Sequence, residues 1–368
     1  MATFLHTADV HLDSAVSAHL NSQEAELRRE EFLRCMSGII DMAKELDFLL
    51  IAGDLFETNT PSERTVAFLK RRFAEIPQTK VVIAAGNHDF YSSSSVYAKE
   101  SLGENVYVLS TEGEVLEFPE HKIRIFGASF LNEFSDGRLY IPSVKRNDGF
   151  FNILLLHADM TNTSDRYNPI DKEFISKSGA DYAALGHIHK RTQIERIGET
   201  YFSYCGAPEG RGFDECGELG CYIVNVKDGA ISPEFKKTCV RRMFKKEISL
   251  EGVCDNIEAE ERIKAEIEKT GTFDDMYKFL LTGRVQKNAI DERVLTESLK
   301  NLPCHIEIEN RTMPNIDIDV YKNANNLCGE FFRIMESKIN VCEGEEKLIA
   351  QKALSLGLSA LLGGADDV

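Results

Sequence analysis

Five short stretches of this chain each follow an apolar run, and each carries side chains that commonly bind metal ions. They are Asp9-Val10-His11, Gly53-Asp54, Gly86-Asn87-His88-Asp89, His157 and Gly186-His187-Ile188-His189. The apolar runs before them predict strands at residues 3–5, 48–51, 81–84, 153–156 and 182–185. Side chains that leave the carboxyl ends of several strands meet where an open α/β sheet normally places its active site. The pattern therefore predicts an α/β fold with a site at one sheet edge.

The donors in these stretches are carboxylates, one carboxamide and several imidazoles. Such a mixed set of oxygen and nitrogen ligands suits a pair of octahedral divalent ions. We expect two metal ions per chain, with Mn²⁺ favoured; Mg²⁺, Fe²⁺ and Zn²⁺ remain alternatives. One isolated histidine is usually a core or surface residue, and we apply that interpretation to His6, His19, His121 and His305.

Taken in order, the motifs resemble those of the calcineurin-like metallophosphoesterases, whose pattern is D-x-H, G-D, G-N-H-D, a later single His and G-H-x-H. The sequence around Asp9, Asp54 and His187 is also similar to bacterial DNA repair exonucleases of the SbcD and YhaO-like type, and so is the segment 206–215. The resemblance extends over residues 1–240. It implies a four-layer α-β-β-α sandwich that hydrolyses phosphodiesters with two metal ions.

The resemblance also implies a distribution of metal ligands between the two ions. The first ion would bind Asp9, His11 and His189, the second Asn87, His157 and His187, and Asp54 would bridge them. A bridging carboxylate holds two cations about 3.5–4 Å apart, which suits activation of a water for in-line attack on phosphorus.

Other residues near the motifs have roles around the metal ions. His88 is the candidate general acid, and Glu57, three residues after Asp54, is expected to orient it. Archaeal and eukaryotic nucleases of the superfamily carry His in place of that Glu. Arg211 either contacts a substrate phosphate or stabilises its own glycine-rich turn. Asp13 and Asp89 are expected to orient neighbouring groups rather than bind metal.

The pattern changes after about residue 240. Helices are predicted at 24–46 and 61–74 between the motif strands, whereas the segment 242–308 reads as a β-α-β-α-β unit. We therefore predict a metallophosphoesterase domain over 1–240 and a small α+β capping domain over 241–320, which the resemblance places against DNA. C-terminal helices over 321–368 either pack on the chain or dock a partner.

Net charge bears on the partners. The 368 residues carry a formal charge of −17, which opposes tight unaided DNA binding because phosphate contacts need Lys and Arg. We expect a homodimer, formed through helices near 62–74 and 92–102, and an SbcC-like coiled-coil ATPase to supply positive surface. The nine cysteines include no C-x-x-C pair, which favours reduced thiols in a cytoplasmic protein. No apolar run reaches the ~20 residues of a membrane span, so no membrane association is expected.

Three functions remain open at this point. The leading one is a metal-dependent DNA nuclease, acting 3′ to 5′ on duplex ends in DNA repair. The second is the same chemistry on a small phosphodiester or a phosphoprotein. The third is a non-catalytic scaffold for an ATPase, which the complete set of ligands disfavours.

Overall fold

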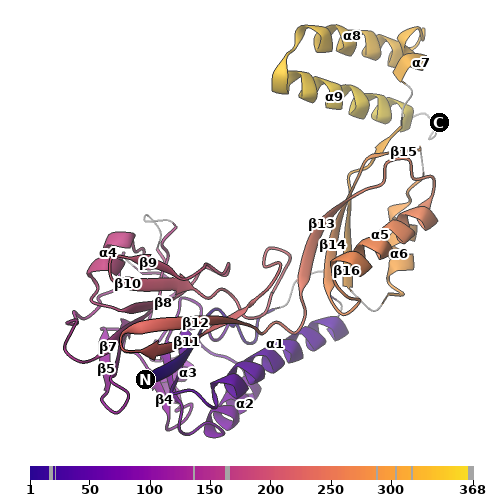
Figure 1. Ribbon diagram of the computed structural model, residues 1–368. Coiled ribbons are helices and arrows are strands. Elements are labelled where there is room, and N and C mark those ends of the chain that lie inside the picture. Colours follow the sequence, from indigo (N-terminus) through magenta and orange to yellow (C-terminus); the bar gives the residue numbers. More distant parts are fainter. Residues whose placement is uncertain are drawn as a thin grey trace. The chain divides into compact units, whose positions relative to one another are not determined.

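The computed structural model describes residues 1–15, 20, 22–135, 137–161, 166–286, 289–302, 305–315 and 318–363. His19 lies outside these residues. The chain divides into two compact units, Met1–Arg242 and Met243–Val368 (Figure 1).

The first sheet of the first unit has six strands in the order β12-β11-β1-β2-β3-β4. Its strands β1 to β4 pair in parallel, and β11 and β12 extend it in antiparallel fashion. The strands are β1 (Ala2–Thr7), β2 (Phe48–Ala52), β3 (Lys80–Ala84), β4 (Val106–Val108), β11 (Gly220–Lys227) and β12 (Ala230–Lys237).

The second sheet also has six strands, in the order β5-β6-β7-β8-β10-β9. Its four central strands are parallel, and an antiparallel strand closes each edge. The strands are β5 (Glu114–Phe118), β6 (Ile123–Ala128), β7 (Phe151–His157), β8 (Tyr182–Gly186), β9 (Glu195–Ile197) and β10 (Thr200–Tyr204). The sequence did not indicate β5 or β9, in which Phe118 of β5 is buried and the other residues are exposed or partly buried.

Side chains alternate between two cores along each central strand. In β2, Phe48 and Leu50 enter the core between the sheets, whereas Leu49 and Ile51 enter the core on the opposite face. Because both faces are buried, the strand is apolar at every position, as the sequence showed.

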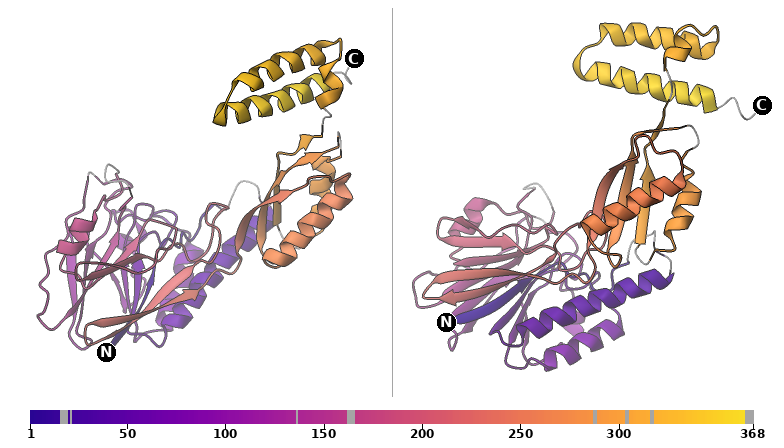
Figure 2. Two further views of the ribbon diagram at one scale, coloured as in Figure 1. Left: turned by 45° about the horizontal axis from the view of Figure 1, so that its top comes forward. Right: turned by 45° about the vertical axis from the view of Figure 1, so that its right-hand side comes forward.

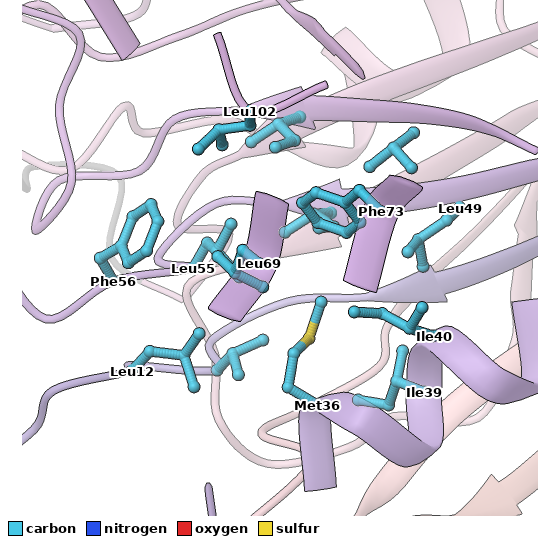
Figure 3. Close-up of a cluster of buried hydrophobic side chains, with 14 of the residues drawn as sticks. Leu12, Met36, Ile39, Ile40, Leu49, Leu55, Phe56, Leu69, Phe73 and Leu102 are labelled. Carbon is cyan, nitrogen blue, oxygen red and sulfur yellow. The ribbon is translucent and has the colours of Figure 1, made fainter. Parts of the chain in front are cut away.

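Helices α1 (Ser22–Ala43) and α2 (Glu63–Ala74) cover the outer face of the first sheet. Figure 3 shows Met36 of α1 close to Leu69 and Phe73 of α2, with Leu49 of β2 to their right beside Ile40. The short helix α3 (Val96–Lys99) lies between β3 and β4 in the chain. The second sheet carries a thinner outer layer that includes α4 (Lys172–Lys177). The predicted α-β-β-α sandwich is confirmed, with one helical layer much the thicker.

A buried histidine ties the two sheets together. His6 of β1 lies with its Nδ1 atom 3.1 Å from the Tyr182 hydroxyl and its Nε2 atom 3.2 Å from the Leu185 carbonyl oxygen, both on β8. The Tyr182 hydroxyl is 3.0 Å from the Ser203 Oγ atom. Burial lowers the pKa of His6 to about 3, so its ring is neutral in the folded chain.

The second unit has the β-α-β-α-β order that the sequence predicts, followed by helices (Figure 2). Its parallel sheet has the order β13-β14-β16, and α5 and α6 pack on one face around Tyr277 and Phe279. The elements are β13 (Met243–Ser249), α5 (Asn256–Thr270), β14 (Met276–Thr282), β15 (Arg284–Val285), α6 (Glu292–Leu299), β16 (His305–Asn310), β17 (Met313–Pro314), α7 (Ile318–Lys322), α8 (Leu327–Val341) and α9 (Gly344–Gly363).

Helices α8 and α9 pack on each other around Phe332, Leu354 and Leu358. Other large apolar side chains on the same two helices are exposed. Over the described residues, no helix is long and apolar enough to cross a bilayer.

Candidate metal centre and active site

The fold brings the five sequence stretches to the carboxyl ends of neighbouring strands. β1, β2 and β3 are adjacent in the first sheet, and β7 and β8 are adjacent in the second. The loops after β1 and β2 continue side by side, because Asp9 N donates to the Gly53 carbonyl at 3.0 Å and His11 N donates to the Asp54 carbonyl at 2.9 Å. The positions of these side chains are thus set by backbone hydrogen bonds.

Several of the predicted ligands have left-handed backbone conformations. The φ angles are 53° at Asp9, 49° at His11, 51° at Asp54 and 101° at His187. Such angles are uncommon outside glycine, although Asp and His tolerate them better than most residues. Strained backbone of this kind is concentrated at functional sites, where the surrounding structure compensates for its cost.

Two glycines allow the ligands to approach the backbone. A Cβ atom at Gly53 would lie 2.2 Å from the Nδ1 atom of His157, and one at Gly86 would lie 2.1 Å from the Oδ1 atom of Asp54. Neither position has room for a side chain. These glycines are therefore part of the site.

Asp9, His11 and His189 form a first cluster, with ligand atoms within 4.8 Å of one another. The Nδ1 atoms of the two histidines lie against carboxylates: His11 Nδ1 is 2.9 Å from Glu57 Oε2, and His189 Nδ1 is 2.6 Å from Glu215 Oε1. Each Nδ1 therefore carries the proton, and each Nε2 keeps its lone pair. The two Nε2 atoms face each other at 3.3 Å, an arrangement that a cation between them would stabilise.

A second cluster surrounds His157, which is fully buried. Its Nδ1–H donates to the Ala52 carbonyl at 2.9 Å. Its Nε2 atom lies 3.0 Å from Asn87 Oδ1, 3.3 Å from Asp54 Oδ2 and 3.3 Å from His187 Nδ1. Acceptor atoms thus converge on one point here too, as a divalent ion requires.

Asp54 lies between the two clusters. Its Oδ2 atom is 3.6 Å from His11 Nε2 and 3.3 Å from His157 Nε2, while its Oδ1 atom accepts a hydrogen bond from His88 N at 3.0 Å. The structure therefore brings all of the predicted ligands together around the residue predicted to bridge them. Their assignment to individual ions stays a prediction.

The electrostatics of the site favour a cation. Burial raises the pKa of Asp54, but the neighbouring His157 and His11 lower it more, to well below its usual range. Burial lowers the pKa of His157, yet Asp54 and Asp9 raise it to about 9. Burial and the charge on His157 lower the pKa of His187 to about 4. The buried carboxylates thus create a negative potential that a proton or a metal ion can neutralise.

The structure places Glu57 closer to His11 than to His88. The Glu57 Oε1 atom is 3.7 Å from His88 Nδ1, whereas the backbone carbonyl of Glu57 is 3.2 Å from it. The ring of His88 also packs edge-on against that of His11, with centroids 4.8 Å apart. His88 is therefore held mainly by the Glu57 main chain, and the carboxylate is engaged by His11.

Sequence reasoning did not assign a role to Glu215, which the structure places at the metal centre. Its Oε1 atom holds His189 and also accepts from Arg211 NH2 at 3.2 Å. Arg211 lies 3.3 Å from Glu57 Oε2 as well, so one guanidinium links the carboxylates behind both facing histidines. The signal for Glu215 in the sequence was its place at the end of the segment 206–215, which resembles the SbcD and YhaO-like exonucleases, but that resemblance gave it no role.

The two remaining acidic residues of the motifs support the loops. Asp89 is fully buried and accepts hydrogen bonds from Leu55 N at 2.9 Å, Gly86 N at 2.7 Å and the Tyr97 hydroxyl at 2.6 Å. Asp13 accepts from Ser62 N at 2.7 Å, at the start of α2. Both orient neighbouring groups in the structure.

The sequence from residue 2 to residue 191, about half of the chain, matches the calcineurin-like phosphoesterase family. The chain belongs to this family. The matched residues include the loops after β1, β2, β3, β7 and β8, and therefore every proposed metal ligand. The family assignment and the donor geometry agree on a phosphoesterase that uses divalent metal ions.

Three curated relatives of this phosphoesterase are informative. It is 31% identical over 247 residues to the uncharacterized metallophosphoesterase YhaO of Bacillus subtilis. It is 27% identical over 220 residues to the DNA double-strand break repair protein Mre11 of Methanopyrus kandleri, and 25% identical over 284 residues to the SbcD component of the nuclease SbcCD of Escherichia coli. The alignments cover 64%, 55% and 62% of this chain and 60%, 48% and 66% of those proteins.

Proposed function

We propose that the protein is a metal-dependent DNA nuclease that hydrolyses phosphodiester bonds by a two-metal mechanism. The convergence of imidazole nitrogens and carboxylates on two neighbouring points, with Asp54 between them, carries this proposal. Two relatives whose names describe DNA repair and nuclease activity support DNA as the substrate.

The fit of the donors to two divalent ions follows from the hydrogen bonds behind them. Each of three histidines has its Nδ1–H held by an acceptor: His11 by Glu57, His189 by Glu215, and His157 by the Ala52 carbonyl. When bound, two divalent ions supply an activated water and neutralise charge on the phosphoryl oxygens. The hydrogen bonds behind the imidazoles make these rings stronger ligands and hold them in place.

His88 is proposed as the general acid. Its side chain is 39% exposed beside the first cluster, and its Nδ1 atom is bound to the Glu57 carbonyl. A protonated ring held in this way can deliver the Nε2 proton to the leaving oxygen. Arg211 is proposed to hold the carboxylates of Glu57 and Glu215 in place and to attract a substrate phosphate, because its guanidinium donates to both of them.

A partner ATPase is proposed to bind the C-terminal helices. Leu327, Ile334 and Val341 of α8 are 69%, 60% and 79% exposed, and their spacing of seven residues aligns them along one side of the helix. Ile349 and Leu356 of α9 repeat the spacing and are also exposed. A coiled-coil helix is the partner that such a stripe suits. The homodimer through helices near residues 62–74 and 92–102 stays a prediction, which sedimentation can measure.

The direct test compares substrates under Mn²⁺ loading. Linear duplex DNA, single-stranded DNA and bis-p-nitrophenyl phosphate are offered to the parent protein and to His88→Ala. We expect cleavage of DNA by the parent and a large loss in the variant. Hydrolysis of bis-p-nitrophenyl phosphate without cleavage of any DNA would reject the nuclease and favour a small phosphodiester.

A further inference from the structure

An aromatic platform lies directly beside the metal centre, and the catalytic residues above do not account for it. The ring of Tyr167 packs against that of His187, with centroids 5.1 Å apart and planes inclined by 35°. The ring of Phe134 packs on Tyr167 in turn, at 5.6 Å and 42°. Phe134 is 43% exposed, so the series of rings extends from a proposed metal ligand to the surface.

The platform is held rigidly by buried polar residues. Ser135 N donates to the Arg166 carbonyl at 2.7 Å, and Asn168 N donates to Ser135 Oγ at 2.7 Å. These bonds join the residues next to the two rings, Ser135 after Phe134 and Arg166 before Tyr167. Asn168 is fully buried. The segments that carry Phe134 and Tyr167 therefore form one assembly.

The same assembly is attached to the metal centre. Asn168 Nδ2 donates to the His157 carbonyl at 3.0 Å, and Asp159 N donates to the Tyr167 carbonyl at 3.2 Å. The left-handed φ of 51° at Asn168 places its side chain in the middle of this network. A ligand on Phe134 would thus have a defined distance from the proposed metal ions.

We infer that Phe134 and Tyr167 form a stacking site for an unpaired nucleobase of the substrate, close to the bond that is cleaved. A half-exposed aromatic ring beside a phosphoryl-transfer site suits the flat face of a base, and stacking of this kind tolerates any sequence. The Arg166 guanidinium carbon lies 5.9 Å from the centroid of Phe134, which adds positive charge near the base and its phosphate. The rings step outward from His187 by 5.1 and 5.6 Å, a distance that a short run of extended nucleotides covers.

This inference rests on the proposed nuclease function and specifies its substrate. A base that stacks on Phe134 has left the double helix, so the site accepts single-stranded DNA or a frayed end in preference to an intact duplex. Loss of a stacked base costs about 1–3 kcal/mol, which corresponds to a factor of about 5 to 150 in rate or affinity.

The test moves one abasic nucleotide along a single-stranded oligonucleotide, from the cleaved bond outward, and measures kcat/KM at each position. We expect the parent to lose about 5- to 150-fold at one position near the cleaved bond. Phe134→Leu keeps an apolar side chain but removes the flat ring, so it should cleave the intact oligonucleotide as slowly as the parent cleaves the abasic one. An abasic nucleotide at that position should not lower kcat/KM of Phe134→Leu any further, whereas Phe134→Trp should show the same profile as the parent.

Tyr140→Leu is the matched control, because Tyr140 is an aromatic residue of the same connection and is 71% exposed. It should leave the abasic profile unchanged. The inference is overturned if the parent shows no sensitive position, or if Phe134→Leu slows every oligonucleotide, abasic or intact, to the same extent.

A second measurement separates this inference from the nuclease proposal. If the parent cleaves no DNA, single-strand binding is measured by fluorescence anisotropy in the presence of EDTA. Tighter binding by the parent than by Phe134→Leu, lost with the abasic strand, supports the stacking site even without cleavage. Equal binding by both proteins rejects it.

Discussion

Replacing Glu215 with Gln should weaken the binding of one metal ion more than the binding of the other. Glu215 Oε1 lies 2.6 Å from His189 Nδ1, and Gln keeps the size of the side chain but removes its charge. Against burial, His189 and Arg211 lower the pKa of Glu215 from 4.5 to about 2. At 1.36 kcal/mol per pKa unit, this corresponds to about 3 kcal/mol of favourable interaction.

That energy is divided between the two partners, so the share of His189 is about 1–2 kcal/mol, or about 5- to 30-fold in metal affinity. Loss of a carboxylate behind a metal-binding histidine usually costs about 10–100-fold, which overlaps this range. Titration with Mn²⁺, followed by calorimetry or by the signal of free Mn²⁺ in electron paramagnetic resonance, resolves the two binding steps. The step that involves His189 should weaken, and the step that involves His157 should change little.

Glu218→Gln is the matched control, because Glu218 is an exposed carboxylate of the same region that pairs with Lys237. It should leave both steps unchanged. Equal weakening of both steps by Glu215→Gln, or no weakening at all, would contradict the role of the Glu215 carboxylate in holding His189.

Four further predictions concern the site and the fold. Asp54→Asn should lower the Mn²⁺ content measured by elemental analysis from two ions to near zero, whereas His157→Ala should lose mainly one ion. His88→Ala should keep both ions and lose about 10²–10⁴-fold in kcat. The pKa of His6 is about 3 in the folded chain and 6.5 in the unfolded chain, so its contribution to the free energy of unfolding is complete above pH 6.5. Below pH 6.5 that contribution is lost at up to about 1.4 kcal/mol per pH unit. In denaturant unfolding, the stability of His6→Gln should therefore fall less steeply than that of the parent as the pH is lowered. Ile334→Glu should abolish capture of a coiled-coil ATPase and leave hydrolysis of bis-p-nitrophenyl phosphate unchanged.

The sequence predicted the parts of this protein whose signal is local. The apolar runs before Asp54 and His157 identified buried parallel strands, and the order of the motifs identified the sandwich and the residues at its edge. Helix α1 was expected at 24–46 and lies at Ser22–Ala43, a difference at the ends of the helix only.

The parts that sequence could not predict depend on contacts between distant segments. Glu215 reaches His189 across a loop without periodicity, and although it lies in the segment 206–215 that resembles the family, no periodic pattern indicates that it is buried and Glu218 is exposed. The carboxylate of Glu57 was expected to orient His88 because of its position in the chain. In the structure it lies 2.9 Å from His11 Nδ1 and 3.7 Å from His88 Nδ1, so it is closer to His11 by 0.8 Å. The platform of Phe134 and Tyr167 joins two connections that no periodic pattern covers.

The left-handed ligands and the crowded glycines bear on how a cell supplies this protein with its ions. The affinity of an unconstrained set of nitrogen and oxygen donors for divalent metal ions follows the Irving–Williams order, which favours copper over manganese. Here Asp9, His11 and Asp54 sit on backbone that cannot relax cheaply, and Gly53 allows His157 no room to retreat. We therefore expect the donors to rearrange little for a competing ion, so that the dimensions of the folded site, together with the ions available when the chain folds, would decide which ion is bound.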